Sequence, residues 1–197
     1  MIKFFHYVVE AVTKYSVLWS KEGHGGQMKN IYLVGFMATG KTAVAKILAG
    51  RLNLKLVDMD AEIEAREKMP ISEIFRLKGE PYFRDLEKGF IKRLARGEGQ
   101  AVACGGGVFV DPENIGTMKK SGVVICLTSK PETILRRTAA DASRPLLNVA
   151  DPQKKIEELL EKRRPFYAQA HHTIDCDALS VEESAQAVLN ILQHERL

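Results

Sequence analysis

The chain has 197 residues, of which 45% are hydrophobic and 27% are charged, a composition that fits one well-packed domain and excludes a disordered chain. Its net charge of +4 comes from scattered lysines and arginines without an aromatic and basic stripe, which favours an anionic small substrate over nucleic acid. No apolar run is long enough to predict a membrane span, and three widely spaced cysteines indicate free thiols in a reducing cytoplasm.

The first 27 residues form an unusual beginning. Residues 1–19 are aromatic and apolar but contain charges, and the glycine-rich stretch 21–27 resembles a linker. Three interpretations stay open: a misassigned start with initiation at Met28, a short amphipathic appendage, or a weak targeting segment. We favour the first, so we expect an extension over 1–27 and a single domain over 28–197.

From Met28 onward, short apolar runs alternate with stretches of helical period, which is typical of a parallel sheet covered by helices. Strands are expected at 31–34, 55–58, 100–104, 123–127 and 172–175. Helices are expected at 43–52, 61–68, 71–77, 81–95, 111–120, 131–137, 152–167 and 180–193, and the last is expected to begin with the capping box Ser180-Val181-Glu182-Glu183. Residues 139–150 lack a clear period and are expected to form a mobile loop. We therefore predict an α/β fold with a five-stranded parallel sheet.

The stretch from Gly35 to Thr42 matches the phosphate-binding pattern G-x-x-x-x-G-K-[ST], and it lies between an apolar run and a helix-like run. In such a loop, backbone N–H groups and the following helix N-terminus bind phosphates. Lys41 is expected to reach the β and γ phosphates, and the Thr42 hydroxyl to bind Mg²⁺. This context makes an accidental match improbable.

Two aspartates, Asp58 and Asp60, end the second apolar run, at the sheet edge where ligands of open α/β sheets bind. Because alternate residues of an extended segment point the same way, both carboxylates are expected on one side. One would face Mg²⁺ and the other the acceptor hydroxyl. The alternative is that one aspartate caps the helix at Ala61.

Arg84 and Glu87 are same-face neighbours on a predicted helix. Their spacing fits a weak surface ion pair, or a glutamate that orients an arginine toward a substrate carboxylate, and it does not decide between them. Gly105, Gly106 and Gly107 directly follow a buried strand, so their backbone could approach a ligand without hindrance from side chains.

Several basic residues remain. Arg136 and Arg137 end a helix, where a cation also stabilises the helix dipole. Arg144 belongs to the irregular segment, from which an arginine can close on a transferring phosphoryl group. A basic cluster at 162–164 has a solvated helix end as its simpler interpretation. The pair at 171–172 lacks further ligands at metal-binding spacing.

With these residues in view, the chain from about Met28 resembles the shikimate kinase family, small P-loop kinases of the nucleoside-monophosphate-kinase-like group. The resemblance rests on an ordered set of motifs: Gly35–Thr42, Asp58-Met59-Asp60, Arg84 with Glu87, Ala103–Gly107, Arg144-Pro145-Leu146-Leu147, and Arg163-x-Pro165-x-Tyr167. It implies a three-layer P-loop NTPase fold with a lid at about 139–150 and an acceptor-binding region at about 59–95.

The resemblance implies phosphorylation of the 3-hydroxyl of shikimate by ATP with Mg²⁺, on the route to chorismate and the aromatic amino acids, by a cytoplasmic monomer without nucleic-acid or membrane partners. The implied catalytic residues are Lys41, Asp60 and Arg144. The nucleotide would contact Thr39, Gly40, Lys41, Thr42, Ala43, Arg137, which would lie beside the adenine, and Arg144. Shikimate would contact Asp60, Arg84, Gly105, Gly106, Gly107 and Arg163, with Arg84 and Arg163 on its carboxylate. Mg²⁺ would be held by Thr42 and, through water, by Asp58.

Two other functions remain open on the residues. The first is another P-loop kinase for a small acceptor such as gluconate, which also combines a carboxylate with hydroxyl groups. The second is a nucleotide-dependent binding module without catalysis. The presence of Lys41, Thr42, Asp58 and Asp60 together argues against the second.

Overall fold

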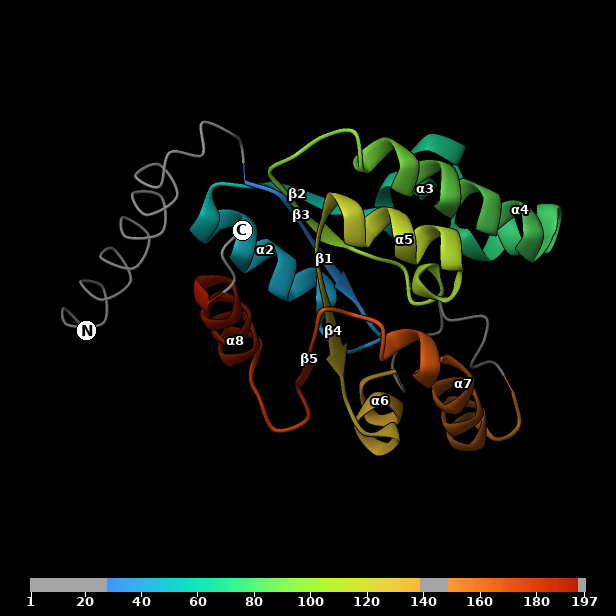
Figure 1. Cartoon of the computed structure of the whole chain (residues 1–197). Coiled ribbons are helices and arrows are strands. Elements are labelled where there is room, and N and C mark those ends of the chain that lie inside the picture. The colour runs from blue at the N-terminus through green and yellow to red at the C-terminus, as the bar shows by residue number, and fades with distance from the viewer. Residues whose placement is uncertain (1–27, 139–148, 195–197) are drawn as a thin grey trace.

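The structure is a computed structural model that describes residues 28–138 and 149–194 (Figure 1). The predicted extension at 1–27 and residues 139–148 of the predicted lid lie outside the described residues. None of the described helices is both long and apolar enough to cross a membrane.

Five strands form a single sheet in which every pair is parallel, in the order β2-β3-β1-β4-β5. Their bounds are β1 Asn30–Val34, β2 Lys55–Asp58, β3 Gln100–Ala103, β4 Gly122–Thr128 and β5 His172–Asp175. The five-stranded parallel sheet predicted from the sequence is confirmed. The strand order could not be read from the alternation of elements and is a finding of the structure.

Seven α-helices and one 3₁₀ turn surround this sheet in the described part of the chain. The helices are α2 Lys41–Leu52, α3 Met59–Glu67, α4 Ile71–Leu94, α5 Pro112–Ser121, α6 Pro131–Thr138, α7 Pro152–Tyr167 and α8 Val181–His194, and the turn is η1 Val108–Val110. Most bounds lie within two residues of the predicted ones. The predicted capping box at the start of α8 is confirmed, since Ser180 and Glu183 each accept a hydrogen bond from the other's backbone N–H.

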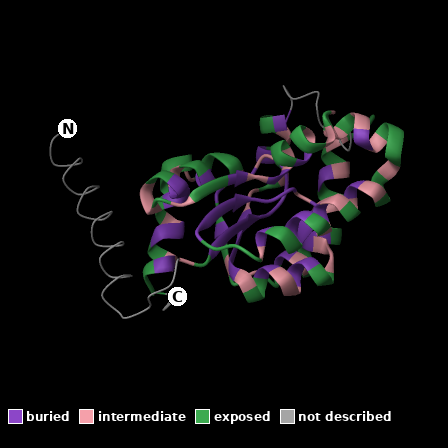
Figure 2. Cartoon of the chain, turned by 90° about the horizontal axis from the view of Figure 1, so that it is seen from above, coloured by how far each residue is buried: buried purple, intermediate pink, exposed green. Residues whose placement is uncertain are grey.

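The three central strands, β1, β3 and β4, are buried on both faces, which is why they are nearly continuous apolar runs (Figure 2). The edge strands β2 and β5 are partly exposed. Along β1, Ile31 and Leu33 pack with residues of α2 and α8, whereas Tyr32 and Val34 pack on the other side with residues of α4, α5 and α7. Figure 1 shows the same arrangement, with α2 and α8 on one side of the sheet. The fold therefore has three layers.

Because all strands are parallel, the loops that leave β1, β2 and β3 meet at one edge of the sheet. Asp58 at the end of β2 is level with Ala103 at the end of β3. The backbone N–H of Cys104 then donates to the carbonyl of Leu33 in β1 over 3.0 Å. The phosphate loop, the aspartate pair and the triple glycine therefore converge at this edge.

Helix α4 is broken at Gly79, whose φ of 80° and ψ of 166° are not helical. The sequence predicted two helices separated at this point, and the break confirms it. A backbone conformation with positive φ favours glycine, because glycine lacks the Cβ atom that makes this conformation unfavourable for other residues. Pro81 follows in the first turn of the second half, where its missing N–H removes no helical hydrogen bond.

Candidate active site

The phosphate loop connects β1 to α2 and bends tightly around one carbonyl. Lys41 Nζ donates to the carbonyl oxygen of Phe36 over 2.7 Å, and the Thr39 hydroxyl donates to the same oxygen over 2.9 Å. Gly35 has a φ of 129°, and a Cβ at this position would collide with the carbonyl oxygen of Leu127. The first glycine of the motif is therefore required by the close approach of β4.

The first turn of α2 presents its backbone N–H groups to the space beside this loop. Gly40 is the N-cap residue, and the first helical hydrogen bond runs from Val44 N to its carbonyl. The N–H groups of Thr42 and Ala43 therefore have no acceptor within the helix. Arg137 on α6 donates to the carbonyl of Ala38 over 3.1 Å, so this cation lies against the loop.

Thr42 and Asp58 place two oxygen ligands next to the phosphate loop. The Thr42 hydroxyl donates to Asp58 Oδ2 over 2.7 Å, whereas Asp58 Oδ1 accepts from the backbone N–H of Ala61 over 3.2 Å. Asp58 is thus the N-cap of α3 and a partner of the loop at the same time. The helix cap that the sequence left open as an alternative is confirmed for Oδ1, and the role of Asp58 at Mg²⁺ stays a prediction.

The predicted geometry of the aspartate pair was wrong. Helix α3 begins at Met59, two residues earlier than expected, so Asp60 belongs to its first turn and not to the extended strand. Asp58 and Asp60 are therefore brought to the site by a cap and a helical turn, and not by strand alternation. The carboxylate of Asp60 still turns toward the triple glycine, because a Cβ on Gly105 would lie 2.7 Å from Asp60 Oδ1.

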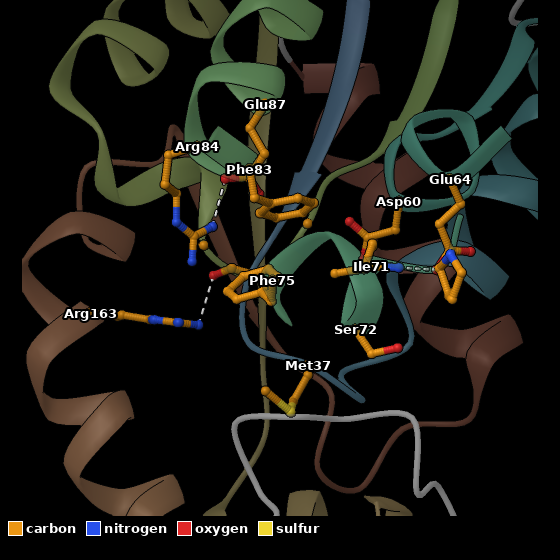
Figure 3. Close-up of a pocket in the computed structure, with 14 residues that line it drawn as sticks. Met37, Asp60, Glu64, Ile71, Ser72, Phe75, Phe83, Arg84, Glu87 and Arg163 are labelled. Carbon is orange, nitrogen blue, oxygen red and sulfur yellow. Dashed lines mark hydrogen bonds and ion pairs between the residues drawn. The ribbon is translucent and has the colours of Figure 1, made fainter. Parts of the chain in front are cut away.

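A cavity of about 290 Å³ lies beside the phosphate loop and contains most of the predicted acceptor residues (Figure 3). Both halves of α4 line it, together with α3, α7 and the loops after β1 and β3. The lining residues are Met37, Asp60, Glu64, Pro70, Ile71, Ser72, Phe75, Phe83, Arg84, Glu87, Gly105, Gly106, Gly107 and Arg163. Met37 belongs to the phosphate loop, so the cavity adjoins the proposed phosphate site directly.

Two glutamates hold the guanidinium of Arg84. Nη1 donates to Glu87 Oε2 over 2.6 Å, and Nε and Nη2 donate to Glu80 Oε1 over 3.1 and 2.7 Å. The Glu87 side chain is only 1% exposed, which rules out a solvated surface pair. Burial lowers the pKa of Arg84, but the two carboxylates outweigh burial and raise it overall.

The triple glycine leaves room for the charged groups of the cavity. A Cβ on Gly107 would lie 2.8 Å from Cζ of Arg84, and a Cβ on Gly105 would lie 3.0 Å from Glu87 Oε1. Gly106 is less crowded, with Arg163 Nη1 at 3.5 Å. The sequence suggested that all three glycines open the backbone to a ligand, whereas in the structure the outer two make space for neighbouring side chains.

Helix α7 contributes a second arginine to the cavity. Arg163 is 8% exposed, donates from Nη1 to the carbonyl of Gly106 over 3.0 Å, and lies 5.3 Å from the ring centre of Phe36. The Tyr167 hydroxyl donates to the same carbonyl over 2.6 Å. Burial raises the pKa of Tyr167 to about 12, so its hydroxyl stays protonated. The carbonyl of Gly106 therefore fixes α7 against the end of β3.

The carboxyl group of Glu87 is electrostatically unusual. Its pKa is raised to about 7, mainly by burial and also by the nearby Asp60, although the positive charges of Arg84 and Arg163 oppose this rise. A group that titrates near neutrality inside a cavity is typical of functional sites. The thiol of Cys104, which is also buried here, has a raised pKa and stays neutral.

A family model described as shikimate kinase matches residues 37–193 of this chain. The chain belongs to the shikimate kinase family. The match includes α2 and every later strand and helix of the fold, and it contains all predicted site residues.

Curated relatives in the shikimate kinase family agree with this assignment. The shikimate kinase of Caldanaerobacter subterraneus is 46% identical over 162 residues, which are 82% of this chain and 95% of that protein. The shikimate kinase of Thermodesulfovibrio yellowstonii is 44% identical over 170 residues, or 86% of this chain and 97% of that protein.

Solved structures of shikimate kinases have the same fold. Shikimate kinase from Acinetobacter baumannii in complex with shikimate is 36% identical, with a TM-score of 0.83 over 86% of this chain and 96% of that one. The enzyme from Aquifex aeolicus is 33% identical, with a TM-score of 0.72 over 84% of this chain and 96% of that one. A gluconokinase from Sinorhizobium meliloti is 16% identical with a TM-score of 0.53 over 83% of this chain and 93% of that one, which shows a shared fold alone.

For this shikimate kinase family member, the structure gathers the predicted residues into two adjoining groups. The group around the phosphate loop contains Thr39, Gly40, Lys41, Thr42, Ala43, Asp58 and Arg137. The cavity contains Asp60, Arg84, Gly105, Gly106, Gly107 and Arg163. Arg144 lies outside the described residues, so its role remains a sequence prediction.

Sequence reasoning missed three parts of this site. Glu80 precedes Arg84 by four residues, a helical spacing that could have identified it. Glu64 accepts a hydrogen bond from the backbone N–H of Ile71 over 2.8 Å and fixes the start of α4, a contact that no local pattern indicates. The ring of Phe36 under Arg163 joins residues far apart in the chain and needed the fold to be seen.

Proposed function

We propose that this chain transfers the terminal phosphoryl group of ATP to the 3-hydroxyl of shikimate and forms shikimate 3-phosphate. Membership of the shikimate kinase family supports the reaction, as does the 36% identical structure in complex with shikimate. The observation that carries the proposal for this chain is the cavity in which Arg84 and Arg163 accompany Asp60 beside the phosphate loop.

The acceptor side fits a small hydroxylated carboxylate. An anion that leaves water needs both positive charge and directional donors, which two arginines provide. Three of the five N–H groups of Arg84 are engaged by Glu80 and Glu87, so within the described part of the chain two are left for a ligand. We propose that these two groups and Arg163 bind the carboxylate of shikimate, and that the backbone of the triple glycine adjoins its ring.

On the donor side, the loop that ends at Lys41 and the first turn of α2 provide N–H groups and a cation for phosphates. Lys41 Nζ lies on the carbonyl of Phe36, a neutral acceptor within the same loop. We infer that this ammonium group moves to the phosphates when the nucleotide binds. Arg137, fixed on the loop at Ala38, is placed for the outer part of the nucleotide.

Asp60 is the proposed catalytic carboxylate. It lines the cavity close to Gly105. In this position its carboxylate can orient the attacking hydroxyl and accept its proton as the oxygen–phosphorus bond forms. The remaining contribution of the chain is to position the two substrates and to stabilise negative charge.

Thr42 and Asp58 fit a magnesium site in chemical type, because a hydroxyl and a carboxylate are hard oxygen ligands. The two oxygens are 2.7 Å apart and adjoin the phosphate loop. Mg²⁺ bound here would neutralise charge on the phosphates. We propose that Thr42 binds the ion directly and that Asp58, already engaged as a helix cap, acts through water.

The domain organisation follows from the same residues. We propose that 28–197 form the catalytic domain, that 59–95 supply most of the acceptor site, and that the enzyme works as a monomer. The three cysteines are free and buried, which suits a reducing cytoplasm. Analytical ultracentrifugation of the active enzyme tests the monomer.

A coupled assay of ADP release tests the reaction. Purified protein, ATP and Mg²⁺ are supplied with shikimate, gluconate or a nucleoside monophosphate as acceptor. We expect turnover with shikimate at roughly 1 to 100 per second, and far less with the others. Gluconate is the informative comparison because it also combines a carboxylate with hydroxyl groups. Preference for another acceptor, or no turnover with any, would contradict the proposal.

A further inference from the structure

One carboxylate oxygen of Glu87 is not explained by the proposed role of the cavity in binding the acceptor. Oε2 accepts from Arg84, but Oε1 is buried and has no hydrogen-bond partner among the residues that the structure describes. The side chain is 1% exposed and lines the acceptor cavity (Figure 3). A buried, unpaired oxygen of an ionised carboxylate is costly, and a proton on it would remove the cost.

The groups around Glu87 come from four elements. Arg84 lies on the same helix, Asp60 on α3, Arg163 on α7, and the neutral thiol of Cys104 follows β3. Glu87 Oε1 and Asp60 Oδ1 both approach the same point beside Gly105, at 3.0 and 2.7 Å from where its Cβ would lie. A proton on Glu87 would therefore reduce the electrostatic repulsion between the two neighbouring carboxylates.

The ionisable groups that line the cavity are two arginines, Arg84 and Arg163, and three carboxyl groups, Asp60, Glu64 and Glu87. Glu80 also contacts Arg84, but its side chain is 55% exposed and its charge is screened by water. A substrate carboxylate adds one more negative charge to this group, and one proton on the buried Glu87 offsets it.

We propose that Glu87 takes up a proton when the carboxylate of the acceptor binds, so that acceptor affinity is coupled to pH through a residue that does not touch the reacting atoms. This inference rests on the proposed function, since it requires an anionic acceptor. Glu87 is thus a positioning residue that also adjusts the charge of the cavity to its ligand.

Thermodynamic linkage between proton binding and acceptor binding determines how the acceptor affinity changes with pH. The carboxyl of free Glu87 has a pKa of about 7 because it is buried, and a bound anion raises that pKa further. The complex therefore holds more protons than the free enzyme above neutrality, so the acceptor binds more weakly as pH rises. We expect the Kd for shikimate to increase about tenfold from about pH 6 to about pH 8.

Isothermal titration calorimetry of the full chain with shikimate tests this coupling. Titrations in Tris and in HEPES, whose ionisation enthalpies differ, count the protons taken up on binding. We expect uptake close to zero at about pH 5.5 and most of one proton at about pH 8. An uptake that stays near zero at the higher pH would overturn the inference even if shikimate binds well.

The variant Glu87→Gln separates protonation from packing. Glutamine has the same shape, can still accept from Arg84 and cannot ionise. We expect it to bind shikimate without proton uptake and with a Kd that changes less than about twofold over this pH range. Glu73→Gln, at the same spacing from Arg76 on the exposed side of α4, should behave like the unchanged protein.

Other outcomes are equally decisive. Proton uptake that persists in Glu87→Gln would assign the proton to another group and overturn the inference. A loss of affinity that is equal at every pH would indicate a purely structural role for Glu87. The proton count of the unchanged protein decides the question even if the variant does not fold. Absence of shikimate binding at any pH would contradict the proposed function as well.

Discussion

Arg84 and Glu87 form an ion pair in which the carboxylate is 1% exposed, although only three residues separate them on α4. The same helix contains a pair with identical spacing, Arg76 and Glu73, whose side chains are 65% and 41% exposed. The order of arginine and glutamate is reversed between the pairs, and each pair faces a different environment. The first lines the acceptor cavity and the second faces solvent, so they form a natural test and control.

Arg84→Lys should weaken recognition of the acceptor. Lysine keeps the charge but lacks the planar fork through which three nitrogens of Arg84 contact Glu80 and Glu87 and can also bind a ligand carboxylate. We expect the KM for shikimate to increase about tenfold to a hundredfold, with a smaller change in kcat. Steady-state kinetics measure both, and Arg76→Lys is the matched control. An unchanged KM would show that Arg84 does not bind the carboxylate.

Asp60→Asn should remove catalysis but keep nucleotide binding. The amide preserves the shape of the side chain, yet it cannot accept a proton from the attacking hydroxyl. We expect kcat to fall about 100-fold to 10,000-fold while the Kd for ATP stays within a factor of about two. Glu62→Gln, on the exposed side of the same helix, is the control. Retention of most of the turnover would rule out Asp60 as the base.

Gly107→Ala should damage the site through Arg84. The added methyl group would lie 2.8 Å from Cζ of Arg84 and displace the guanidinium. We expect a KM for shikimate at least about tenfold higher, comparable with that of Arg84→Lys. Gly116→Ala is the control, because nothing lies within 4 Å of a Cβ there. Normal kinetics for Gly107→Ala would mean that Arg84 can move away without cost.

Glu87→Gln should make stability less dependent on pH. Burial raises the folded pKa of Glu87 to about 7, above the unfolded value near 4.5. The folded chain therefore binds more protons between these values, so its stability falls as pH rises from about 4.5 through about 7. The full loss is roughly 3 kcal/mol. Urea unfolding across this range measures it, and the variant should lose less than the unchanged chain.

Asp58→Asn should affect Mg²⁺ more than folding. Asparagine is also a good N-cap residue, so α3 should keep its cap, but the charge facing Thr42 is lost. We expect the Mg²⁺ concentration for half-maximal activity to increase about tenfold, with a nearly unchanged Tm. Asp151→Asn, which alters the cap of α7 away from the site, is the control. An unchanged Mg²⁺ requirement would leave Asp58 with its cap role only.

Local patterns predicted the elements of this fold well, because alternating apolar runs, caps and glycines act over a few residues. The break at Gly79 and the capping box at Ser180 are examples. The aspartate pair shows the limit of this reasoning: α3 begins at Met59, since Asp58 can cap a helix as readily as end a strand. A boundary shift of two residues changed the geometric argument, although both residues still reach the site.

Contacts between distant elements were beyond local reasoning. Arg163 approaches Gly106 across 57 residues because β1 lies between β3 and β4 and α7 packs on the same face. The spacing of residues along the sequence does not predict that strand order. The ion pair of Glu87 is buried and that of Glu73 is exposed. This difference likewise depends on which side of α4 the rest of the fold covers.

The break in α4 divides the cavity wall into two helical pieces that contact each other through side chains. Ile71, Ser72 and Phe75 precede Gly79, whereas Arg84 and Glu87 follow it. The ring of Phe75 lies 4.9 Å from that of Phe83 and 6.0 Å from Cζ of Arg84, so this residue supports the arginine across the break. Evolution or design can therefore reshape the wall for a differently substituted ring at Ile71 and Ser72, whereas a change at Phe75 would also alter the contact with Arg84.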